Sequence, residues 1–291
     1  MASSSISRDS ETGAPVVTVG VRFHDASLMP LLERCLASIN AQTGVRTSIL
    51  LALQGFDQKA LNATRQCCDR TLVSRHTRYR ILNVGNPEGR DLRATLLNRI
   101  IEEHHSVGES EYLTFIDFDD IWFQTALRTL VDGLMIGACA LSYCDVHCAD
   151  VYHDNGRVFL RNIRDHFRIS VKSKRSLLTG NFLPLHSYMF HTGRLSRDDL
   201  RYDESLVRLE DYELLLRIAA RHPFSGVYRN RLIGLYNFYA LRDGFGNSTS
   251  NIFSGGADSR DRSDWQSSTE ALLRKTAGIS WTDFFGEEWV L

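Results

Sequence analysis

Apolar runs of strand length alternate with stretches of helical periodicity along the first half of the chain. The predicted strands cover residues 16–24, 48–53, 79–84 and 112–116, and the predicted helices cover 28–39, 58–72 and 92–101. Strands that alternate with helices in this way are typical of βαβ units. We therefore predict an α/β fold with a mostly parallel central sheet flanked by helices.

The second half of the chain has a less regular pattern. Its most distinct helix covers residues 210–221, carries Leu214, Leu215 and Ile218 on one face, and stops before Pro223. The other predicted elements are a helix over 125–135, strands over 138–146, 156–160, 187–190 and 227–236, a polar loop over 240–263, and helical or amphipathic pieces over 265–276 and 281–289. The pattern predicts a disordered tail over 1–14, a main domain over 15–239, and a segment over 240–291 that docks on that domain.

Composition and charge narrow the class of protein. Hydrophobic residues make up 43% of the 291 positions and charged residues 24%, which is typical of a globular chain. The 34 basic residues nearly balance the 35 acidic ones, so the chain has no net positive charge that would attract nucleic acid. We therefore expect no nucleic-acid partner. The longest apolar run, 133–141, is far shorter than the roughly 20 residues of a membrane span. The first fourteen residues also lack the apolar stretch of a secretory signal, so we expect a cytoplasmic protein without a transmembrane segment.

The six cysteines show no paired CxxC spacing. A reducing cytosol would keep them as thiols. The segment from Cys144 to Cys148 has the sequence CDVHC and could supply thiolate and imidazole ligands to a metal. Buried free cysteines are the interpretation that we favour there.

Three carboxylates follow the last predicted strand of the first half. Asp117, Asp119 and Asp120 come directly after a strand that does not alternate between apolar and polar residues, and ligands of open α/β sheets bind outside the carboxyl ends of the strands. Grouped carboxylates repel one another unless a cation compensates them, and hard oxygen ligands suit Mg²⁺ or Mn²⁺. The alternative is an Asp-rich turn that caps the following helix. We favour a site for a metal ion and a diphosphate.

A second acidic pair, Glu210 and Asp211, opens the helix over 210–221. Acidic residues in a first turn interact favourably with the helix dipole, so this pair taken alone indicates a structural role.

Taken in order, several segments resemble the inverting family-2 glycosyltransferases of the GT-A fold, over roughly residues 16–235. They are VGVRFHD at 19–25, FIDFDD at 115–120, GNFLP at 180–184, SYMF at 187–190, YDESL at 202–206 and LEDYELLLR at 209–217. The acidic motif after the strand is similar to the family's DxD segment, and the LED stretch is similar to the one that bears its catalytic base. Two acidic motifs in this order, on a strand end and a helix start, are more specific than either motif alone.

The resemblance implies a metal-dependent inverting glycosyltransferase that moves a sugar from a nucleoside-diphosphate sugar to an acceptor hydroxyl, in glycan or surface polysaccharide synthesis. Asp119 would hold Mn²⁺ or Mg²⁺, with Asp117 and Asp120 nearby. Asp211 would be the base that takes the proton from the acceptor hydroxyl, and Glu210 would orient Asp211 or be the base itself. The implied donor-binding residues are Phe23, His24, Asp25, Gln54, Arg93, Asp117 and Arg242. The implied acceptor-binding residues are Asn181, His186 and His191, each of which also fits a structural polar role. The acceptor could be a glycan, a lipid-linked sugar or a protein, and peripheral membrane association is compatible with the sequence.

Two positions depart from the family pattern. Arg22 stands where the family usually carries Pro, and Gln54 stands near the end of the second strand, where the family has an acidic pair that helps to hold the nucleoside. One alternative function is a haloacid-dehalogenase-type phosphatase, whose nucleophile also ends an apolar strand, although here more than a hundred residues precede the motif. Another is a catalytically inactive protein of the same fold that binds glycans or a partner.

Overall fold

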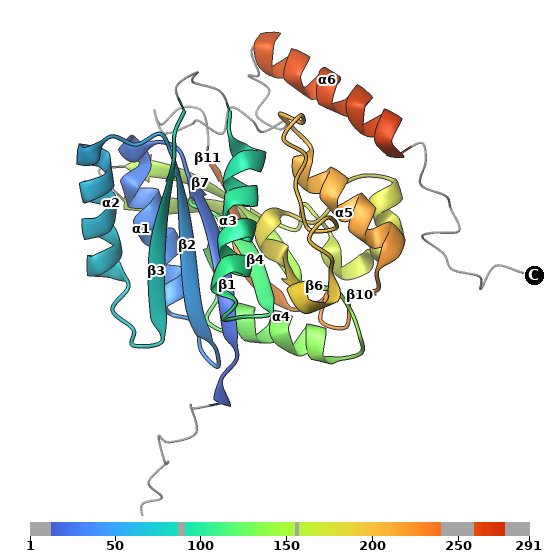
Figure 1. Cartoon of the computed structure of the whole chain (residues 1–291), viewed down its shortest axis with the longest axis horizontal. Helices are drawn as coiled ribbons and strands as arrows, with labels where there is room; N and C mark the ends of the chain where they lie inside the picture. The colour runs from blue at the N-terminus through green and yellow to red at the C-terminus, as the bar shows by residue number, and fades with distance from the viewer. Residues whose placement is uncertain (1–12, 87–90, 155–156, 240–258, 277–291) are drawn as a thin grey trace, which may run out of the picture.

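The computed structural model describes residues 13–86, 91–154, 157–239 and 259–276. Its larger sheet has seven strands in the order β10-β6-β9-β4-β1-β2-β3 (Figure 1). Their bounds are β1 Val16–Phe23, β2 Arg46–Gln54, β3 Thr77–Val84, β4 Tyr112–Asp117, β6 Leu141–Tyr143, β9 Tyr188–His191 and β10 Phe224–Ser225. Strands β3, β2, β1 and β4 run parallel, and β9 lies antiparallel between β4 and β6. The predicted fold class, α/β with a mostly parallel central sheet, is confirmed.

Helices cover both faces of this sheet. The helices are α1 Met29–Asn40, α2 Gln58–Thr71, α3 Arg93–Val107, α4 Ala126–Met135 and α5 Glu210–Arg221, while α6 Ser259–Thr276 lies outside the sheet (Figure 1). The chain steps from β1 through β2 to β3 in one direction and then returns to β4, so right-handed crossovers place α3 on the opposite face from α1 and α2. Figure 1 shows α3 in front of the sheet. The reversal between β1 and β4 creates a switch point, where the carboxyl ends of both strands face the same crevice.

The centre of the sheet is closely packed. Five consecutive residues of β1 are buried, as are four of β4, because helices or other elements cover both faces. Gly20 of β1 lies under α3: a Cβ there would lie 2.5 Å from the Phe115 ring and 2.8 Å from Ile100. Glycine therefore allows α3 and β4 to approach β1.

A second sheet of four strands stands beside the pocket described below. It has the order β5-β11-β7-β8, with β5 Ile121–Trp122, β7 Asp145–Asp154, β8 Arg157–Arg164 and β11 Leu232–Tyr239. The single strand predicted over 138–146 is wrong, because the chain changes sheets at Cys144. The Cys144 N–H donates to the Ser187 carbonyl at 2.9 Å, whereas the next N–H, of Asp145, donates to the Arg231 carbonyl at 2.9 Å.

Other boundaries also differ from the sequence prediction. The strand predicted from residue 227 begins at Leu232, because residues 227–230 form turns. Helix α6 begins at Ser259, inside the predicted loop over 240–263. The rest of that loop and the piece predicted over 281–289 lie outside the described residues. Within the described ranges, none of the helices has the length and apolar character that a membrane span requires.

Short 3-10 turns lie between several of these elements. They are η2 Ala26–Leu28, η3 Ile169–Val171, η4 Lys174–Leu178, η5 Leu185–Ser187 and η6 Thr192–Arg194. The turns η3, η4 and η5 carry the chain from the end of β8 to the start of β9.

Candidate active site

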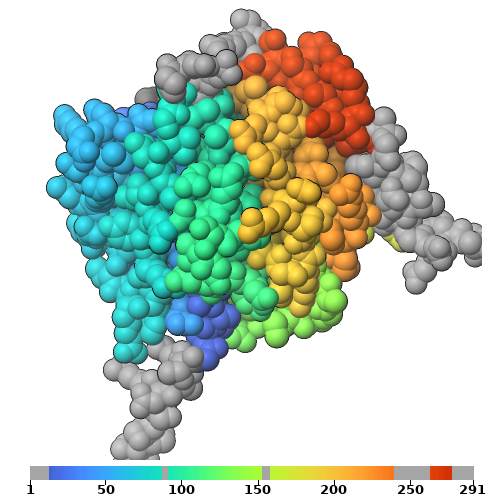
Figure 2. Space-filling model, viewed as in Figure 1, coloured from blue at the N-terminus to red at the C-terminus, as the bar shows by residue number. Residues whose placement is uncertain are grey.

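A cavity of about 900 Å³ lies at the carboxyl ends of β1, β2 and β4. Its other walls come from the segment between β8 and β9, from the start of α5, and from α6. Figure 2 shows α6, in red, lying against the gold segment that leads toward α5. The Arg208 N–H donates to the Ser268 hydroxyl at 3.1 Å, which fastens α6 to that segment. The cavity is thus built from chain segments that are far apart in sequence.

Arg22 joins the two acidic motifs. Its Nε lies 2.6 Å from Asp117 Oδ1 and its Nη2 lies 3.2 Å from Oδ2, while Nη1 donates to Glu210 Oε1 at 3.1 Å. Arg22 and Asp117 are register partners at the ends of β1 and β4, so the strand pairing itself brings them together. Burial acts to raise the pKa of Asp117, but the charge and hydrogen bonds of Arg22 outweigh it and hold that pKa below its usual value. The residue that departs from the family pattern is therefore central to this site.

Asp119 lines the cavity two residues beyond Asp117. Burial and the neighbouring carboxylates of Asp120 and Asp117 raise its pKa well above the usual value. Its carbonyl oxygen accepts a hydrogen bond from the Asn237 side chain at 2.6 Å, which anchors the turn after β4 to β11. A carboxylate whose negative charge is disfavoured in this way gains from a bound cation, and oxygen donors suit Mn²⁺ or Mg²⁺. Asp119 therefore offers the kind of oxygen ligand that the metal ion predicted from the sequence would bind.

Asp120 has a different environment from Asp119. It is 2% exposed and does not line the cavity: Oδ1 accepts from the Asn237 N–H at 2.8 Å, and Oδ2 lies 3.2 Å from His186 Nδ1. His186 is fully buried and stacks on the Tyr236 ring. These contacts hold the turn after β4 against η5 and β11. Asp120, predicted to bind metal, and His186, predicted to bind the acceptor, therefore lie behind the residues that line the cavity.

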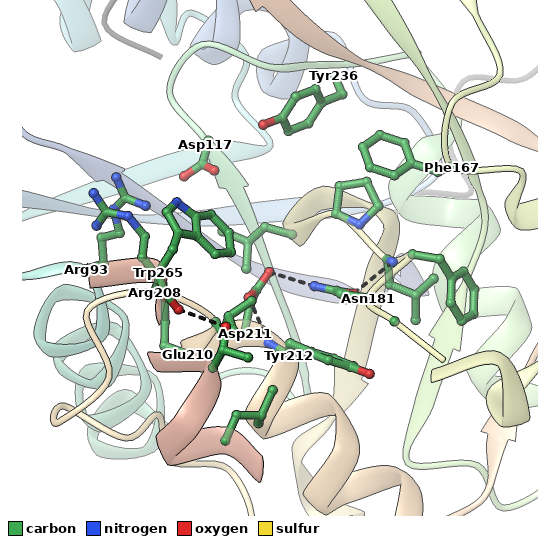
Figure 3. A pocket seen from close by; sticks show the side chains of 18 of the residues that line it. Arg93, Asp117, Phe167, Asn181, Arg208, Glu210, Asp211, Tyr212, Tyr236 and Trp265 are labelled. Carbon is green, nitrogen blue, oxygen red and sulfur yellow. Dashed lines mark hydrogen bonds between the residues drawn. The ribbon is translucent and has the colours of Figure 1, made fainter. Parts of the chain in front are cut away.

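Asp211 projects into the cavity from the first turn of α5 (Figure 3). Its Oδ2 accepts from Asn181 Nδ2 at 3.1 Å, and its Oδ1 accepts from the Tyr212 N–H at 2.7 Å. Burial, followed by the charge of Glu210, raises the pKa of Asp211 to about 7, although the Tyr212 hydrogen bond and Arg22 oppose the shift. A carboxylate with this pKa can take a proton near neutral pH.

Leu209, directly before this pair, has a strained backbone. Its φ of 65° and ψ of 16° lie in the left-handed region, which costs a residue with a side chain about 1–3 kcal/mol. The Leu209 side chain packs against the core, and the Tyr212 hydroxyl donates to the Leu177 carbonyl. These contacts hold the turn that aims Glu210 and Asp211 at the cavity.

A second group of charges lies beside Arg22. Asp91 Oδ2 accepts from Arg208 Nη1 at 2.9 Å and lies 3.1 Å from Arg93 Nε, and all three residues line the cavity. Burial, followed by the charges of Arg93 and Arg22, lowers the pKa of His24, which lines the same wall. Arg93 was among the predicted donor-binding residues, but Asp91 and Arg208 were not, because a sequence with 34 basic residues does not show which arginines converge.

The remaining predicted donor and acceptor residues divide into two sets. Gln54 and Asn181 line the cavity, as do His24, Arg93 and Asp117. Phe23 is fully buried against the Phe56 and Phe118 rings, and Asp25 caps η2 by accepting from the Ser27 N–H at 2.9 Å. Neither of these two lines the cavity. Arg242 lies outside the described residues.

His191 lies far from the cavity. It pairs with Tyr112 at the amino end of β4, whereas Asp117 is at the carboxyl end of the same strand. The structure therefore does not support a contact between His191 and the acceptor.

Helix α6 brings residues to the cavity that the sequence analysis did not single out. Trp265, Thr269, Leu272 and Leu273 line its outer wall. Figure 3 shows the Trp265 indole extending between the arginines and Asp211. Its Nε1 is buried and has no hydrogen-bond partner among the described residues. The helical pattern over 265–276 was the available signal, but it does not show which face α6 turns inward.

The fold is that of GT-A-like glycosyltransferases. One solved structure that is similar to this chain is that of residues 1–349 of TarS from S. aureus in complex with UDP. The match has a TM-score of 0.54 and 14% sequence identity, and it covers 90% of this chain and 72% of the TarS fragment. The complex of the same TarS fragment with UDP-GlcNAc gives a TM-score of 0.52 and 14% identity, covering 91% of this chain and 73% of that one.

Another is the mannosyltransferase PcManGT from Pyrobaculum calidifontis, in complex with GDP-Man and Mn²⁺. Its TM-score is 0.53 and its identity 14%, over 94% of this chain and 78% of that one. The sequence itself matches no protein-family description and no curated protein.

Proposed function

We propose that this protein is a metal-dependent glycosyltransferase that moves a sugar from a nucleoside-diphosphate donor to an acceptor hydroxyl with inversion. The observation that carries the proposal is the arrangement around Arg22. This residue joins a strand-end DxD motif to a helix-start acidic pair, across a cavity on a glycosyltransferase fold. TarS was solved with UDP and UDP-GlcNAc, and PcManGT with GDP-Man and Mn²⁺, which supports a nucleotide-sugar as the donor.

Asp119 is the residue that we propose as the cation ligand. Both oxygens of Asp117 already bind Arg22, and those of Asp120 face β11 and η5, whereas Asp119 lines the cavity with a raised pKa. A bound Mn²⁺ or Mg²⁺ would supply Lewis-acid stabilisation for the departing nucleoside diphosphate. Arg93 and Arg208 on the same wall would add positive charge beside the diphosphate.

Asp211 is the residue that we propose as the base. Its pKa of about 7 suits proton transfer at neutral pH, and Asn181 fixes the orientation of its carboxylate. As the acceptor oxygen attacks the anomeric carbon, Asp211 takes the hydroxyl proton and the bond to the diphosphate breaks, which inverts the configuration at that carbon. Glu210 is held by Arg22 and would position that arginine. The acceptor that we propose is a glycan hydroxyl, in surface polysaccharide synthesis.

Incubation with UDP-GlcNAc, GDP-Man and related donors in the presence of Mn²⁺ tests the proposal. Release of nucleoside diphosphate that depends on metal and is lost in Asp211→Asn would support it. Release of inorganic phosphate would instead indicate the phosphatase alternative. Donor binding without release of either product, across glycan, lipid-linked and protein acceptors, would indicate an inactive binding protein.

A further inference from the structure

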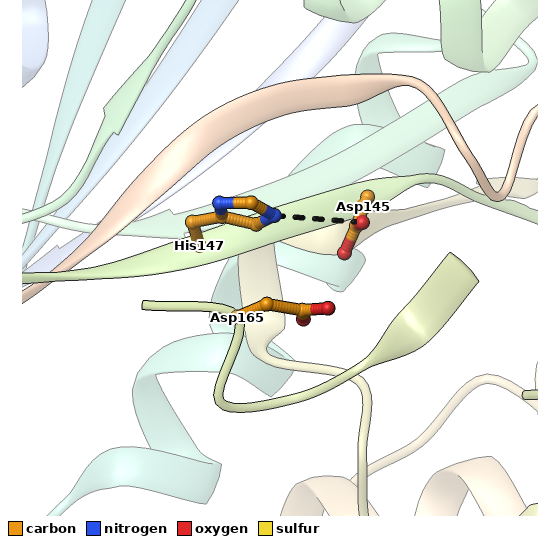
Figure 4. Close-up of side chains that lie close together, drawn as sticks. All are labelled: Asp145, His147 and Asp165. Atoms are coloured by element: carbon orange, nitrogen blue, oxygen red, sulfur yellow. Dashed lines mark ion pairs between the residues drawn. The ribbon is translucent and has the colours of Figure 1, made fainter. Parts of the chain in front are cut away.

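A second cluster of possible metal ligands lies outside the cavity, where β7 begins. Asp145, His147 and Asp165 each offer one ligand atom, and these atoms lie within 4.8 Å of one another. Asp145 and His147 are two residues apart on β7, so their side chains share one face of the strand. Asp165 directly follows the end of β8 (Figure 4).

The segment CDVHC thus divides between two faces of β7. Val146 and Cys148 are buried on one face of the strand, and Cys144, directly before it, is buried as well. Cys148 therefore points away from the face that carries Asp145 and His147. Asp145 and His147 supply oxygen and nitrogen donors on that face.

One oxygen of the buried Asp145 carboxylate has no hydrogen-bond partner among the described residues. The residue is 5% exposed, yet its Oδ1 accepts no hydrogen bond from the part of the chain that the structure describes. Its Oδ2 is 3.7 Å from His147 Nε2, which is too long for a hydrogen bond. Figure 4 shows the free oxygen of Asp145 turned toward the Asp165 carboxylate. A buried carboxylate oxygen that faces a second carboxylate is costly unless a cation lies between them.

We propose that Asp145, His147 and Asp165 bind a divalent transition-metal ion, and that Zn²⁺ is the ion that this ligand set favours. One imidazole and two carboxylates form a mixed nitrogen and oxygen set, which suits Zn²⁺ better than the all-oxygen ions Mg²⁺ and Ca²⁺, and Zn²⁺ binds such sets more tightly than Mn²⁺ does. Zinc bonds of about 2.0–2.2 Å place tetrahedral ligand atoms roughly 3.4 Å apart, close to the present separation of Asp145 and His147. Water would complete the coordination.

Asp165 has the freedom to complete this site. It is exposed, and one of its oxygens, Oδ1, accepts from the Arg168 N–H at 2.8 Å, which leaves the other for a metal ion. The ion would tie the start of β7 to the chain after β8. That chain continues into His166 and Phe167, which line the cavity, and Phe167 packs edge-on against the Tyr236 ring. The proposed role is therefore structural, in holding one wall of the cavity, and it does not depend on the reaction proposed above.

Equilibrium dialysis of the purified full chain against Zn²⁺, followed by metal analysis, tests the site. We expect one bound Zn²⁺ in the wild type and an affinity at least about 10-fold lower in His147→Gln and Asp165→Asn, since loss of even an outer-shell partner costs that much. His76→Gln and Asp198→Asn are matched controls that remove a half-exposed imidazole and an exposed carboxylate elsewhere, and they should bind Zn²⁺ as the wild type does. Asp119→Asn should also keep this Zn²⁺, which separates the site from the cavity.

Co²⁺ substitution provides a second readout that reports on coordination directly. Visible absorption bands of low-symmetry Co²⁺ should appear in the wild type and in Asp119→Asn, and should be lost in His147→Gln. Circular dichroism of each variant checks that it is folded, which is expected because Asp165 is exposed and the His147 side chain is 27% exposed. Equal Zn²⁺ affinity in the wild type, His147→Gln and Asp165→Asn, or Co²⁺ spectra that do not change, would overturn the proposal.

Discussion

The acidic segment after β4 and the acidic pair at the start of α5 share one arginine, but the pKa of a second carboxylate is raised for a different reason in each. After β4, Arg22 keeps the pKa of Asp117 low, while burial and neighbouring carboxylates raise the pKa of Asp119. At α5, Arg22 pairs with Glu210, and the pKa of Asp211 rises to about 7. In each motif, one carboxylate is paired with the same guanidinium and another is left with a raised pKa.

This comparison suggests how similar acidic residues can acquire different chemistry. Asp119 has the carboxylates of Asp117 and Asp120 close by, so a bound cation best compensates the repulsion among these charges. The raised pKa of Asp211 comes mainly from burial, so a proton best compensates its buried negative charge. Its two oxygens accept hydrogen bonds from Asn181 and Tyr212. If the two motifs have these separate functions, substitutions in the first should affect metal-dependent donor binding, and substitutions in the second should affect proton transfer.

Asp211→Asn should have the largest effect. The amide keeps the shape of the side chain but cannot accept the acceptor proton, so turnover should fall by roughly 10² to 10⁴ while donor affinity persists. Transfer rate and donor affinity are measured together. Glu210→Gln is the matched control in the adjacent position: a large loss there with near-normal transfer by Asp211→Asn would move the base to Glu210.

Arg22→Met should destabilise the fold more than any other single change in the cavity. It leaves Asp117 and the buried Glu210 without their shared partner, and breaking a buried ion pair costs about 3–5 kcal/mol in the free energy of unfolding. Urea denaturation measures this loss. The penalty should shrink as the pH falls, because Asp117 has a lowered pKa in the folded state and its contribution is present only while it is ionised. Arg22→Lys should recover part of the stability, and a loss that does not vary with pH would contradict the electrostatic cause.

Asp119→Asn should remove metal-dependent donor binding and leave the fold intact. Calorimetry with a nucleoside diphosphate and Mn²⁺ should show at least a 10-fold loss of affinity, the extent typical of a damaged metal site. The free energy of unfolding without metal should increase at neutral pH, because a carboxyl whose pKa is raised in the folded state destabilises that state at every pH above its unfolded value. Unchanged affinity with Mn²⁺ would exclude Asp119 as a ligand.

The pH dependence of the transfer rate should follow Asp211. The base must be deprotonated, so kcat/KM should fall about tenfold for each pH unit below a pKa of about 7 and level off above it. Arg22→Lys should move this midpoint only slightly, because a positive charge near Asp211 is retained, whereas Arg22→Met should move it upward. A profile that stays flat between pH 5 and 8 would mean that Asp211 is not the base.

The regular half of the fold could be read from the sequence. The strands and helices from β1 to β4 follow local periodicity, which depends only on neighbouring residues. The same holds for α5, whose predicted bounds match the observed helix. Asp119 could be proposed because it follows the end of a buried strand, whereas the role of Asp211 came from the resemblance to a glycosyltransferase family, since an acidic pair at a helix start taken alone indicates a structural role. The division of 138–146 between two sheets could not, because it depends on hydrogen bonds to Ser187 and Arg231.

The selection among similar residues depended on tertiary structure. Arg22 meets Asp117 and Glu210 across separations of 95 and 188 residues, and no local pattern shows such a pair. The sequence groups Asp120 with Asp119 around one predicted metal ion, and only the positions of β11 and η5 turn Asp120 away from the cavity. The sequence by itself determined the regular elements from β1 to β4 and helix α5, because local periodicity specifies them, and it showed which acidic residues lie beside β4 and α5. Burial and long-range ion pairs set the pKa and the partner of each carboxylate, and these exist only once the chain has folded.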